Sequence, residues 1–341
     1  MRQSIAAAGL DFPWFQPSLF PMGTHPDPVI LITTKLGDGQ EARLLAAAPG
    51  ARILRESDLT ADPALISDVE ICYPRLPPAL WRAAGKLKWL QATMAGVDSL
   101  LALPEVREHP AVITNVHIHA HCIAEHLWGM TLMLTRNLHA SLRAQETGKW
   151  ETALVSDGVA TLAGRTLCIA GLGFIGAYCA ALGRAFGMQV IGISRHGRAD
   201  SSADEVVGPD KRREAFARSR VIMLILPETP DTRGFVDRPE LDAMEGAFLL
   251  NAGRGSAIVT DELVTALEDG RVRGAGLDVT DPEPLPAGHR LWSMPNAIIT
   301  PHYGGVHPGY DEEAFSVFCD NLERWVRGQP LQHVVDRTAG Y

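Results

Sequence analysis

The residues of this chain that first suggest chemistry form a glycine-rich turn, "GLGFIG", at residues 171–176. Gly171, Gly173 and Gly176 fit the pattern G-x-G-x-x-G, which is weak evidence alone because glycine is a common residue. Here an apolar strand pattern leads into the turn and a helix pattern leads out of it. In that context the turn predicts a dinucleotide site, because the glycines permit a tight turn, approach of a pyrophosphate to the backbone and close packing of helix on strand. The alternative is a strand-to-helix turn that binds nothing.

The next predicted strand ends without the acid that an NAD site usually carries. Such a site has Asp or Glu about 20 residues beyond the first glycine, where the carboxylate accepts hydrogen bonds from the ribose 2′-hydroxyl. Ser194 stands at this place and is followed by Arg195, His196 and Arg198. A carboxylate would repel a 2′-phosphate, whereas Arg195 can pair with one. We therefore expect NADP to be preferred, with NAD possible. The alternative is a solvated loop whose arginines bind nothing specific.

Three later segments carry groups suited to a ketone or hydroxyl beside a carboxylate. They are "NAGRGSAIVTDELVTAL" (251–267), "GLDVTDPEPLP" (276–286) and "LWSMPNAIITPHYGG" (291–305). Each follows or ends a predicted strand, and doubly wound sheets bind ligands beyond the carboxyl ends of their strands. In order and spacing these segments resemble the D-isomer-specific 2-hydroxyacid dehydrogenase family, and the resemblance extends over nearly everything from residue 28 onward.

The resemblance implies a catalytic triad of Arg254, Glu283 and His302. Histidine exchanges a proton near neutral pH, so His302 could protonate a carbonyl oxygen, or deprotonate a hydroxyl, while hydride moves at the carbon. A carboxylate against the imidazole would orient it and favour its charged form, which is the role of Glu283. The planar guanidinium of Arg254 could hold the substrate carboxylate and polarise the carbonyl next to it. Taken singly, each of the three could instead be structural.

The resemblance also implies contacts for the substrate and the cofactor. A turn in the first domain, "MAGVDSL" at 94–100, is similar to one whose backbone N–H groups bind the substrate carboxylate, here at Ala95, Gly96 and Val97 together with Arg254. Asp278 matches a position near the nicotinamide carboxamide, or is an acid that caps a loop. Together with the turn and the strand end described above, the positions expected to contact the cofactor are Gly171, Gly173, Phe174, Ile175, Gly176, Ser194, Arg195, His196, Arg198, Pro227, Thr232, Asn251, Ala252, Asp278, His302 and Gly304.

Short apolar strands that alternate with helices must position these groups. Strand patterns occur first at 28–33, 69–73, 87–93 and 111–116, and again, after a long helix from about His119 to Glu146, at 166–171, 189–194, 221–226, 247–251, 274–279 and 297–300. This alternation predicts an α/β fold with parallel sheets. The resemblance implies two domains, with a doubly wound Rossmann cofactor domain inserted into a flavodoxin-like substrate domain.

The expected domain limits follow from this order. Residues 1–27 form an N-terminal extension, 28–118 with 306–341 a discontinuous substrate-binding domain, and 119–305 the NAD(P)-binding domain. The last helix pattern comes after the second sheet is complete, so it is expected to return to the first domain. The long helix could link the domains or make a dimer contact, and we expect a homodimer.

Composition limits the partners. With 341 residues the chain can form two domains, and 31 Lys plus Arg against 40 Asp plus Glu leave a net charge of −9 without a concentrated basic stripe. We therefore expect neither nucleic acid nor a membrane as a partner. Five scattered cysteines, at 72, 122, 168, 179 and 319, are typical of reduced thiols in a cytoplasmic protein.

One segment departs from the family pattern. Relatives usually carry a glycine after "TN", whereas "TNVHIHAHCIAEH" has His117 or Ile118 there, which could reshape the hinge or the pocket wall. His117, His119 and His121 alternate as metal ligands could, but nothing nearby in the sequence completes a ligand set, and we expect no metal site.

The sequence therefore predicts an NAD(P)H-dependent oxidoreductase, with NADP preferred, that interconverts a small 2-keto acid and its D-2-hydroxy acid. Glyoxylate and hydroxypyruvate are the examples that the family suggests. Two alternatives stay open: a phosphite or phosphonate dehydrogenase on the same fold, and a non-enzymatic, dinucleotide-sensing protein similar to a corepressor.

Overall fold

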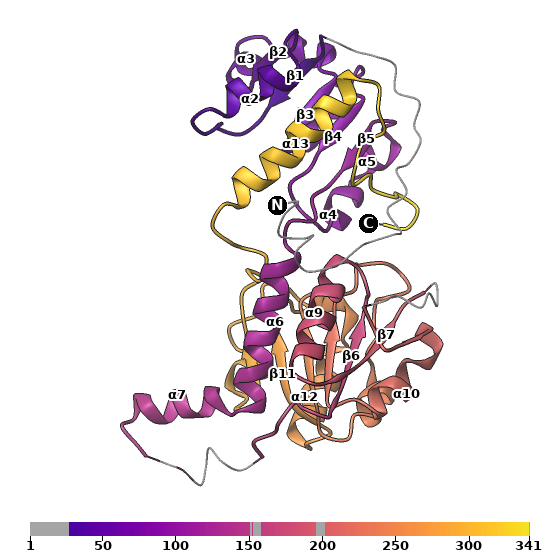
Figure 1. Cartoon of the computed structure of the whole chain (residues 1–341). Helices are drawn as coiled ribbons and strands as arrows, with labels where there is room; N and C mark the ends of the chain where they lie inside the picture. Colours follow the sequence, from indigo (N-terminus) through magenta and orange to yellow (C-terminus); the bar gives the residue numbers. More distant parts are fainter. Residues whose placement is uncertain (1–26, 151, 153–157, 196–201, 341) are drawn as a thin grey trace. The chain divides into compact units, whose positions relative to one another are not determined.

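The computed structural model describes residues 27–150, 152, 158–195 and 202–340. These residues divide into two compact units (Figure 1): unit 1 runs to Val116 and resumes at Gly309, and unit 2 is His117–Pro308. Both crossovers lie within three residues of the limits expected from the sequence. Residues 1–26, most of the expected extension, lie outside the described residues, as do His196 and Arg198.

Unit 1 is built on a five-stranded parallel sheet. Its order, β2-β1-β3-β4-β5, is the flavodoxin order. The strands are β1 (Val29–Ile32), β2 (Arg52–Arg55), β3 (Ile71–Tyr73), β4 (Trp89–Gln91) and β5 (Val112–Thr114). The sequence pattern misses β2, because this edge strand reads "RILR" and lacks the continuous apolar run of a central strand.

The C-terminal helix completes the core of unit 1. In Figure 1, α13 (Tyr310–Val326) lies across the sheet. Phe318 of this helix is stacked on Tyr73 at 4.5 Å between ring centroids, and Trp325 is stacked on Trp89 at 5.7 Å. The shorter helices of this unit are α2 (Gln40–Ala47), α3 (Glu56–Ala61), η1 (Pro63–Asp68), η2 (Pro78–Leu80), α4 (Asp98–Leu101) and α5 (Pro104–Glu108).

Unit 2 contains a seven-stranded parallel sheet in the order β12-β11-β10-β9-β6-β7-β8. Its strands are β6 (Thr166–Ala170), β7 (Gln189–Ile193), β8 (Glu205–Val207), β9 (Val221–Leu224), β10 (Ala247–Asn251), β11 (Val272–Leu277) and β12 (Ala297–Ile299). The order is that of a doubly wound sheet, which confirms the predicted fold class. The sequence predicts six of these strands. It misses β8, which is short and only half-buried at the edge.

Within the described residues, the helices of unit 2 are α6 (Ala120–Thr135), α7 (Leu138–Glu146), α9 (Phe174–Ala185), η3 (Pro209–Lys211), α10 (Arg212–Ala217), α11 (Arg238–Asp242), η4 (Gly255–Ala257), α12 (Thr260–Glu268) and η5 (Arg290–Ser293). The expectation of one helix over 119–146 is wrong. Asn137 has a left-handed backbone with φ 52°, which asparagine adopts more readily than most residues and which ends α6. The second half, α7, extends away from the body of unit 2 in Figure 1 and has no buried residue.

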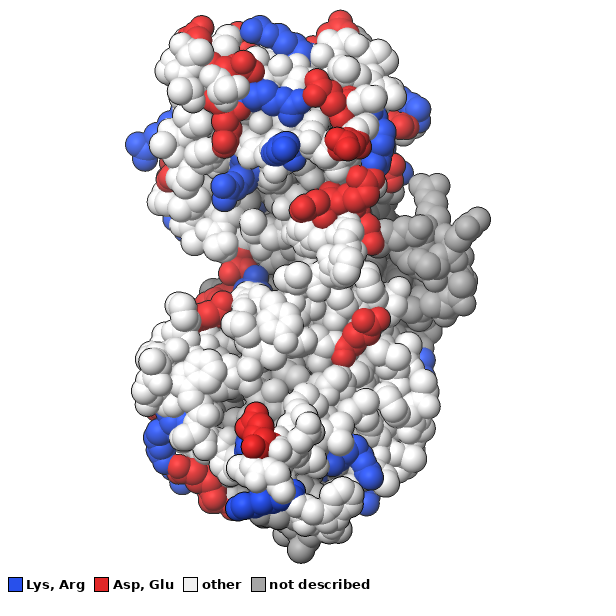
Figure 2. Space-filling view, turned by 90° about the vertical axis from the view of Figure 1, so that its left-hand side faces the viewer, with Lys and Arg blue, Asp and Glu red and all other residues white. Residues whose placement is uncertain are grey.

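Charged residues of both signs are interspersed over each unit on the face that Figure 2 presents. Among the described residues, no helix combines the length and the apolar character needed to cross a membrane.

Candidate active site

The glycine-rich turn leaves β6 at the point where the order of the sheet reverses, because β6 pairs with β7 on one side and β9 on the other. Gly171 has φ 102°, and its N–H donates to Ile193 O at the end of β7 (3.1 Å). A Cβ on Gly171 would lie 2.3 Å from Ile225 O, just beyond β9. Only glycine fits a turn pressed between two strand ends.

The other two glycines of the turn differ in what surrounds them. Gly173 caps the N-terminus of α9, and a Cβ there would meet nothing within 4 Å. A Cβ on Gly176 would lie 2.2 Å from Gly171 O, so this glycine permits the close packing of helix on turn. An open backbone at the positive end of a helix is what a pyrophosphate requires, so the turn fits a dinucleotide. Phe174 and Ile175 form the first turn of α9.

The end of β7 lies beside the turn. Gly192 has room for no side chain, since its Cβ would lie 2.1 Å from Leu172 Cδ1, so the turn packs directly on this strand. Ser194 follows, half-buried, with its N–H donating to Val207 O of β8 (3.0 Å), and Arg195 is exposed. The strand thus ends in a serine, where an NAD site usually carries an acid, and an arginine is next in the chain.

Two loops farther along the same edge are held by their own polar groups. After β9, the Thr232 hydroxyl donates to Pro227 O (2.6 Å) and closes the loop. After β10, the buried Asn251 side chain accepts from Gly253 N (3.0 Å) and donates to Arg254 O (2.9 Å), which fixes the backbone through Ala252.

Arg254 is half-buried in this second loop, and its Nη1 donates to Gly253 O (2.8 Å). A Cβ on Gly253 would lie 2.6 Å from Leu226 N and O, and one on Gly255 would lie 2.0 Å from Thr280 O. The residues that flank Arg254 must therefore be glycines for its loop to pack between the loops that follow β9 and β11.

Glu283 and His302 are in direct contact. His302 Nδ1 lies 2.7 Å from Glu283 Oε1, and the two side chains are 48% and 43% exposed. Since a carboxylate accepts, Nδ1 carries the hydrogen and Nε2 remains available to a ligand. His302 also has a left-handed backbone, with φ 52°, a conformation that is uncommon for a non-glycine residue and that is found at functional sites.

Asp278 holds the loop that carries His302. Its carbonyl accepts from His302 N (2.9 Å). Its carboxylate accepts from Thr300 Oγ1 (2.7 Å), Tyr303 N (3.1 Å) and Gly304 N (3.0 Å). Burial acts to raise the pKa of this carboxyl, but hydrogen bonds from His126, Thr300 and Gly304 hold the pKa below its usual value. The ionised carboxylate of Asp278 therefore holds the loop together. Its contact with the nicotinamide stays a prediction.

Sequence reasoning did not single out His126, on α6. Its Nε2 lies 2.9 Å from Thr300 Oγ1 and 3.4 Å from Asp278 Oδ1. The side chain thus supports the carboxylate that supports the His302 loop. Its position in the "AEH" stretch, 174 residues before Thr300, gives no local signal of this contact.

The residues expected to bind the substrate carboxylate lie in unit 1, after β4. Asn115 Nδ2 donates to Ala95 O (2.7 Å), and Val97 is buried immediately before α4. Tyr310 of α13 donates to Thr93 O (2.7 Å). The turn that contains Ala95, Gly96 and Val97 is therefore anchored at two points of unit 1.

A family model described as "D-isomer specific 2-hydroxyacid dehydrogenase, NAD binding domain" matches residues 128–304, more than half of the chain. The chain belongs to the D-isomer-specific 2-hydroxyacid dehydrogenase family. The predicted family is thereby confirmed, and the matched range contains the glycine turn, Arg254, Glu283 and His302.

Solved structures of the family agree over the whole fold. A family member from Aeromonas salmonicida is 36% identical, with a TM-score of 0.77 over 91% of this chain and 99% of that one. An NADPH-dependent glyoxylate/hydroxypyruvate reductase from Sinorhizobium meliloti, solved with NADP and sulfate, is 27% identical, with a TM-score of 0.78 over 92% of this chain and 100% of that one.

A curated relative points in the same direction. Glyoxylate/hydroxypyruvate reductase A of Escherichia fergusonii is 29% identical over 275 residues, which are 78% of this chain and 85% of the relative. The present chain, as a member of the dehydrogenase family, is thus an oxidoreductase with an NAD(P)-binding domain.

Proposed function

We propose that the protein is an NADPH-dependent reductase of small 2-keto acids, with the D-2-hydroxy acid as product. The observation that carries the proposal is the contact between Glu283 and His302 at the carboxyl edge of a dinucleotide-binding sheet. The names of the reductases in Sinorhizobium meliloti and Escherichia fergusonii favour glyoxylate and hydroxypyruvate as first substrates to test.

In the proposed reaction the nicotinamide, when bound, supplies hydride to the carbonyl carbon. His302 delivers a proton from Nε2 to the carbonyl oxygen, while Glu283 holds Nδ1 and stabilises the positive charge of the imidazolium. Arg254 pairs with the substrate carboxylate and polarises the carbonyl beside it. Backbone N–H groups of Ala95, Gly96 and Val97 are proposed to bind the same carboxylate.

The proposed preference for NADP rests on the end of β7. Ser194 stands where an NAD site carries an acid, so no carboxylate at that position repels a 2′-phosphate. The exposed Arg195 supplies a positive charge next to it. The relative from Sinorhizobium meliloti was solved with NADP, and one from Xanthobacter autotrophicus, 27% identical, with NADPH. The remaining cofactor contacts assigned from the family are part of the same proposal.

We also propose that the protein is a cytoplasmic homodimer. All five cysteines lie in the described part of the chain and none forms a disulfide, as expected in a reducing compartment. On α7, Leu138 and Leu142 are 47% and 53% exposed and stand four residues apart, so they share one helix face. A second copy of the chain would cover this face.

The test is turnover of a panel of 2-keto acids, followed by loss of NADPH absorbance. His302→Asn should lower kcat by about 10²- to 10⁴-fold, the usual contribution of an acid–base residue. Glu283→Gln should also lower kcat, whereas Asp281→Asn, a neighbouring exposed acid, should not. If the wild type binds NADPH but reduces none of the acids, the non-enzymatic alternative is favoured. If phosphite reduces NADP⁺ instead, the protein is a phosphite dehydrogenase.

A further inference from the structure

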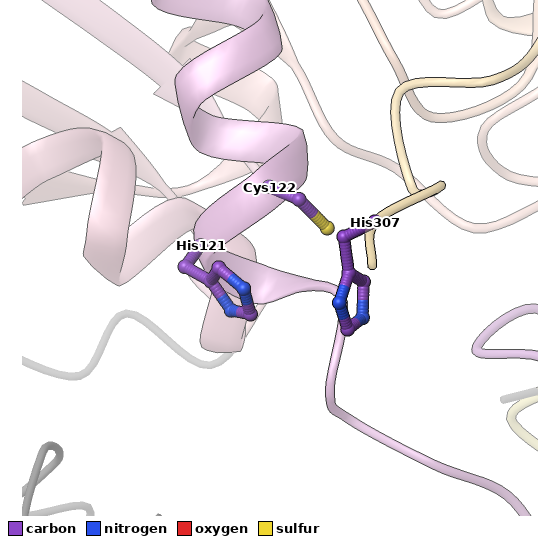
Figure 3. Close-up of side chains that lie close together, drawn as sticks. All are labelled: His121, Cys122 and His307. Carbon is purple, nitrogen blue, oxygen red and sulfur yellow. The ribbon is translucent and has the colours of Figure 1, made fainter. Parts of the chain in front are cut away.

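The histidine-rich segment at the start of α6 meets a residue that the sequence places far away. His117 packs on the ring of Phe174, and His119 is buried under the loop that carries Gly305. His121 instead joins Cys122, the next residue, and His307 from the loop after β12 (Figure 3). The fold therefore brings together three side chains of which the sequence showed only two side by side.

The donor atoms of this cluster are close enough to share one ion. A nitrogen of His121, Cys122 Sγ and a nitrogen of His307 all lie within 4.8 Å of one another, and the two imidazole rings are 5.2 Å apart between centroids. In Figure 3 the Cys122 thiol points toward His307, with the His121 ring on the other side. Ligands of one tetrahedral zinc ion stand roughly 3.5 Å apart, given bond lengths of about 2.0–2.3 Å. Small rotations of the three side chains would bring the donor atoms from within 4.8 Å to the roughly 3.5 Å that a zinc site requires.

The backbone holds the two halves of the cluster together. Cys122 Sγ lies 3.2 Å from His119 O and 3.4 Å from Gly305 O, and its single hydrogen is shared between these two acceptors. A Cβ on Gly305 would lie 3.0 Å from His119 Cδ2, so the loop passes close over the start of α6. His307 Nδ1 lies 3.1 Å from Pro308 O, an arrangement in which Nε2 is the nitrogen that can face an ion. The close passage of the Gly305 loop over the start of α6 thus brings His307 to Cys122 without a metal, and the thiol hydrogen is lost only when an ion binds.

Burial and ligand chemistry favour a borderline-soft ion. Cys122 is buried with 8% exposure, whereas His121 and His307 are half-buried, so an ion could enter from solvent and reach the thiol. Two imidazoles and one thiolate suit Zn²⁺ and disfavour Mg²⁺ or Ca²⁺, which prefer oxygen ligands. We propose that His121, Cys122 and His307 bind one divalent transition-metal ion, Zn²⁺ above all, with solvent as the fourth ligand. The thiol loses its proton to solvent when the Zn–S bond forms.

A metal ion at this site would link the segment where the chain enters unit 2 to the segment where it leaves. Unit 2 begins at His117 and ends at Pro308, so the ligands stand close to both crossovers. A bound ion would tie the start of α6 to the loop that leaves unit 2. This restraint is separate from the proposed reduction, because none of the three ligands belongs to the proposed catalytic set.

The experiment uses the full chain without a histidine tag, stripped with a chelator and titrated with Zn²⁺ against a chromophoric competitor. We expect one equivalent of zinc per chain and release of a proton. Cys122→Ser, His121→Ala and His307→Ala should each weaken binding at least about tenfold, since even outer-shell changes cost 10- to 100-fold. Substitution by Co²⁺ should give a thiolate-to-metal charge-transfer absorption that Cys122→Ser abolishes.

Two matched variants separate this site from others. Cys319→Ser replaces a cysteine that is equally buried, at 8% exposure, but lies in unit 1, and should leave the cobalt absorption unchanged. His302→Ala removes the histidine of the proposed catalytic pair and should leave zinc binding unchanged. Zinc binding that survives Cys122→Ser and His307→Ala, or that His302→Ala removes, would overturn the proposal. So would the absence of stoichiometric binding to the folded wild type, whatever the result of the turnover assay.

Discussion

At the scale of single residues, the site depends on side chains that fix other side chains. The carboxylate of Asp278 accepts three hydrogen bonds from the loop of His302, and His126 contacts both Asp278 and Thr300. Glu283 then orients the imidazole through Nδ1. None of these residues needs to touch the substrate, because each acts on the residue next to it. Contacts of this kind keep a reactive side chain in one geometry.

The proposed preference for NADP can be tested at the end of β7. Ser194→Asp restores the carboxylate that an NAD site carries, so the affinity for NADPH should fall and that for NADH should rise. Arg195→Ala should weaken NADPH by roughly 10- to 100-fold, the value of a hydrogen bond to a charged group, and change NADH little. Dissociation constants measured by fluorescence titration check both. A wild type that binds NADH more tightly than NADPH would contradict the prediction.

Residue types alone could predict only part of this. The motif around Gly171 and the family resemblance at Glu283 and His302 identified groups that the structure brings to one sheet edge. The position of Cys122 beside His307 could not be predicted, because 185 residues separate them and neither stands in a motif. The same holds for His126 and Thr300. Contacts of this kind arise from packing between elements, which a local pattern does not record.

At the scale of elements, strands that are buried on both sides were the easiest to predict. β9, which reads "VIML", and β10, which reads "AFLLN", are fully buried and continuous in apolar character. β2 and β8 lie at sheet edges, where one side meets solvent and charged residues are tolerated, so their patterns are weak. The break between α6 and α7 depends on the backbone of one residue, Asn137, and the apolar spacing continues across it.

The turn between β6 and α9 makes a prediction that separates binding from stability. At Gly173 an added Cβ meets nothing, so Gly173→Ala should fold, and the free energy of unfolding should fall by roughly 0.5–1 kcal/mol because alanine is a poorer N-cap than glycine. Because that space is where a pyrophosphate would approach, the affinity for NADPH should fall by about tenfold or more, which is about 1.4 kcal/mol.

Gly176→Ala is the matched comparison. Its Cβ would lie 2.2 Å from Gly171 O, a backbone atom that cannot move away without opening the turn. Overpacking of this kind lowers the free energy of unfolding by about 1–3 kcal/mol. Each kcal/mol lowers Tm by a few degrees in a unit of this size. Thermal unfolding and NADPH titration of both variants provide the check. If Gly173→Ala left NADPH affinity intact, the turn would not be the pyrophosphate site.

At the scale of the whole molecule, α7 is a helix of nine residues that contributes nothing to the core of unit 2. It has no buried residue, and Leu138 and Leu142 present an apolar face to solvent in the single chain. Apolar side chains spaced by one helical turn are typical of a face that packs against another element. A homodimer formed through α7 would bury Leu138 and Leu142 of both copies.

Light scattering after size exclusion tests this assembly. The wild type should elute at twice the chain mass of 36.9 kDa, and Leu138→Glu with Leu142→Glu should shift it to the mass of one chain, because each charge would be buried unpaired. Glutamate is a good helix former, so α7 itself should persist. Leu45→Glu changes a leucine with 39% exposure on α2 and should leave the mass unchanged. A double variant that remains a dimer would place the contact between copies on another surface.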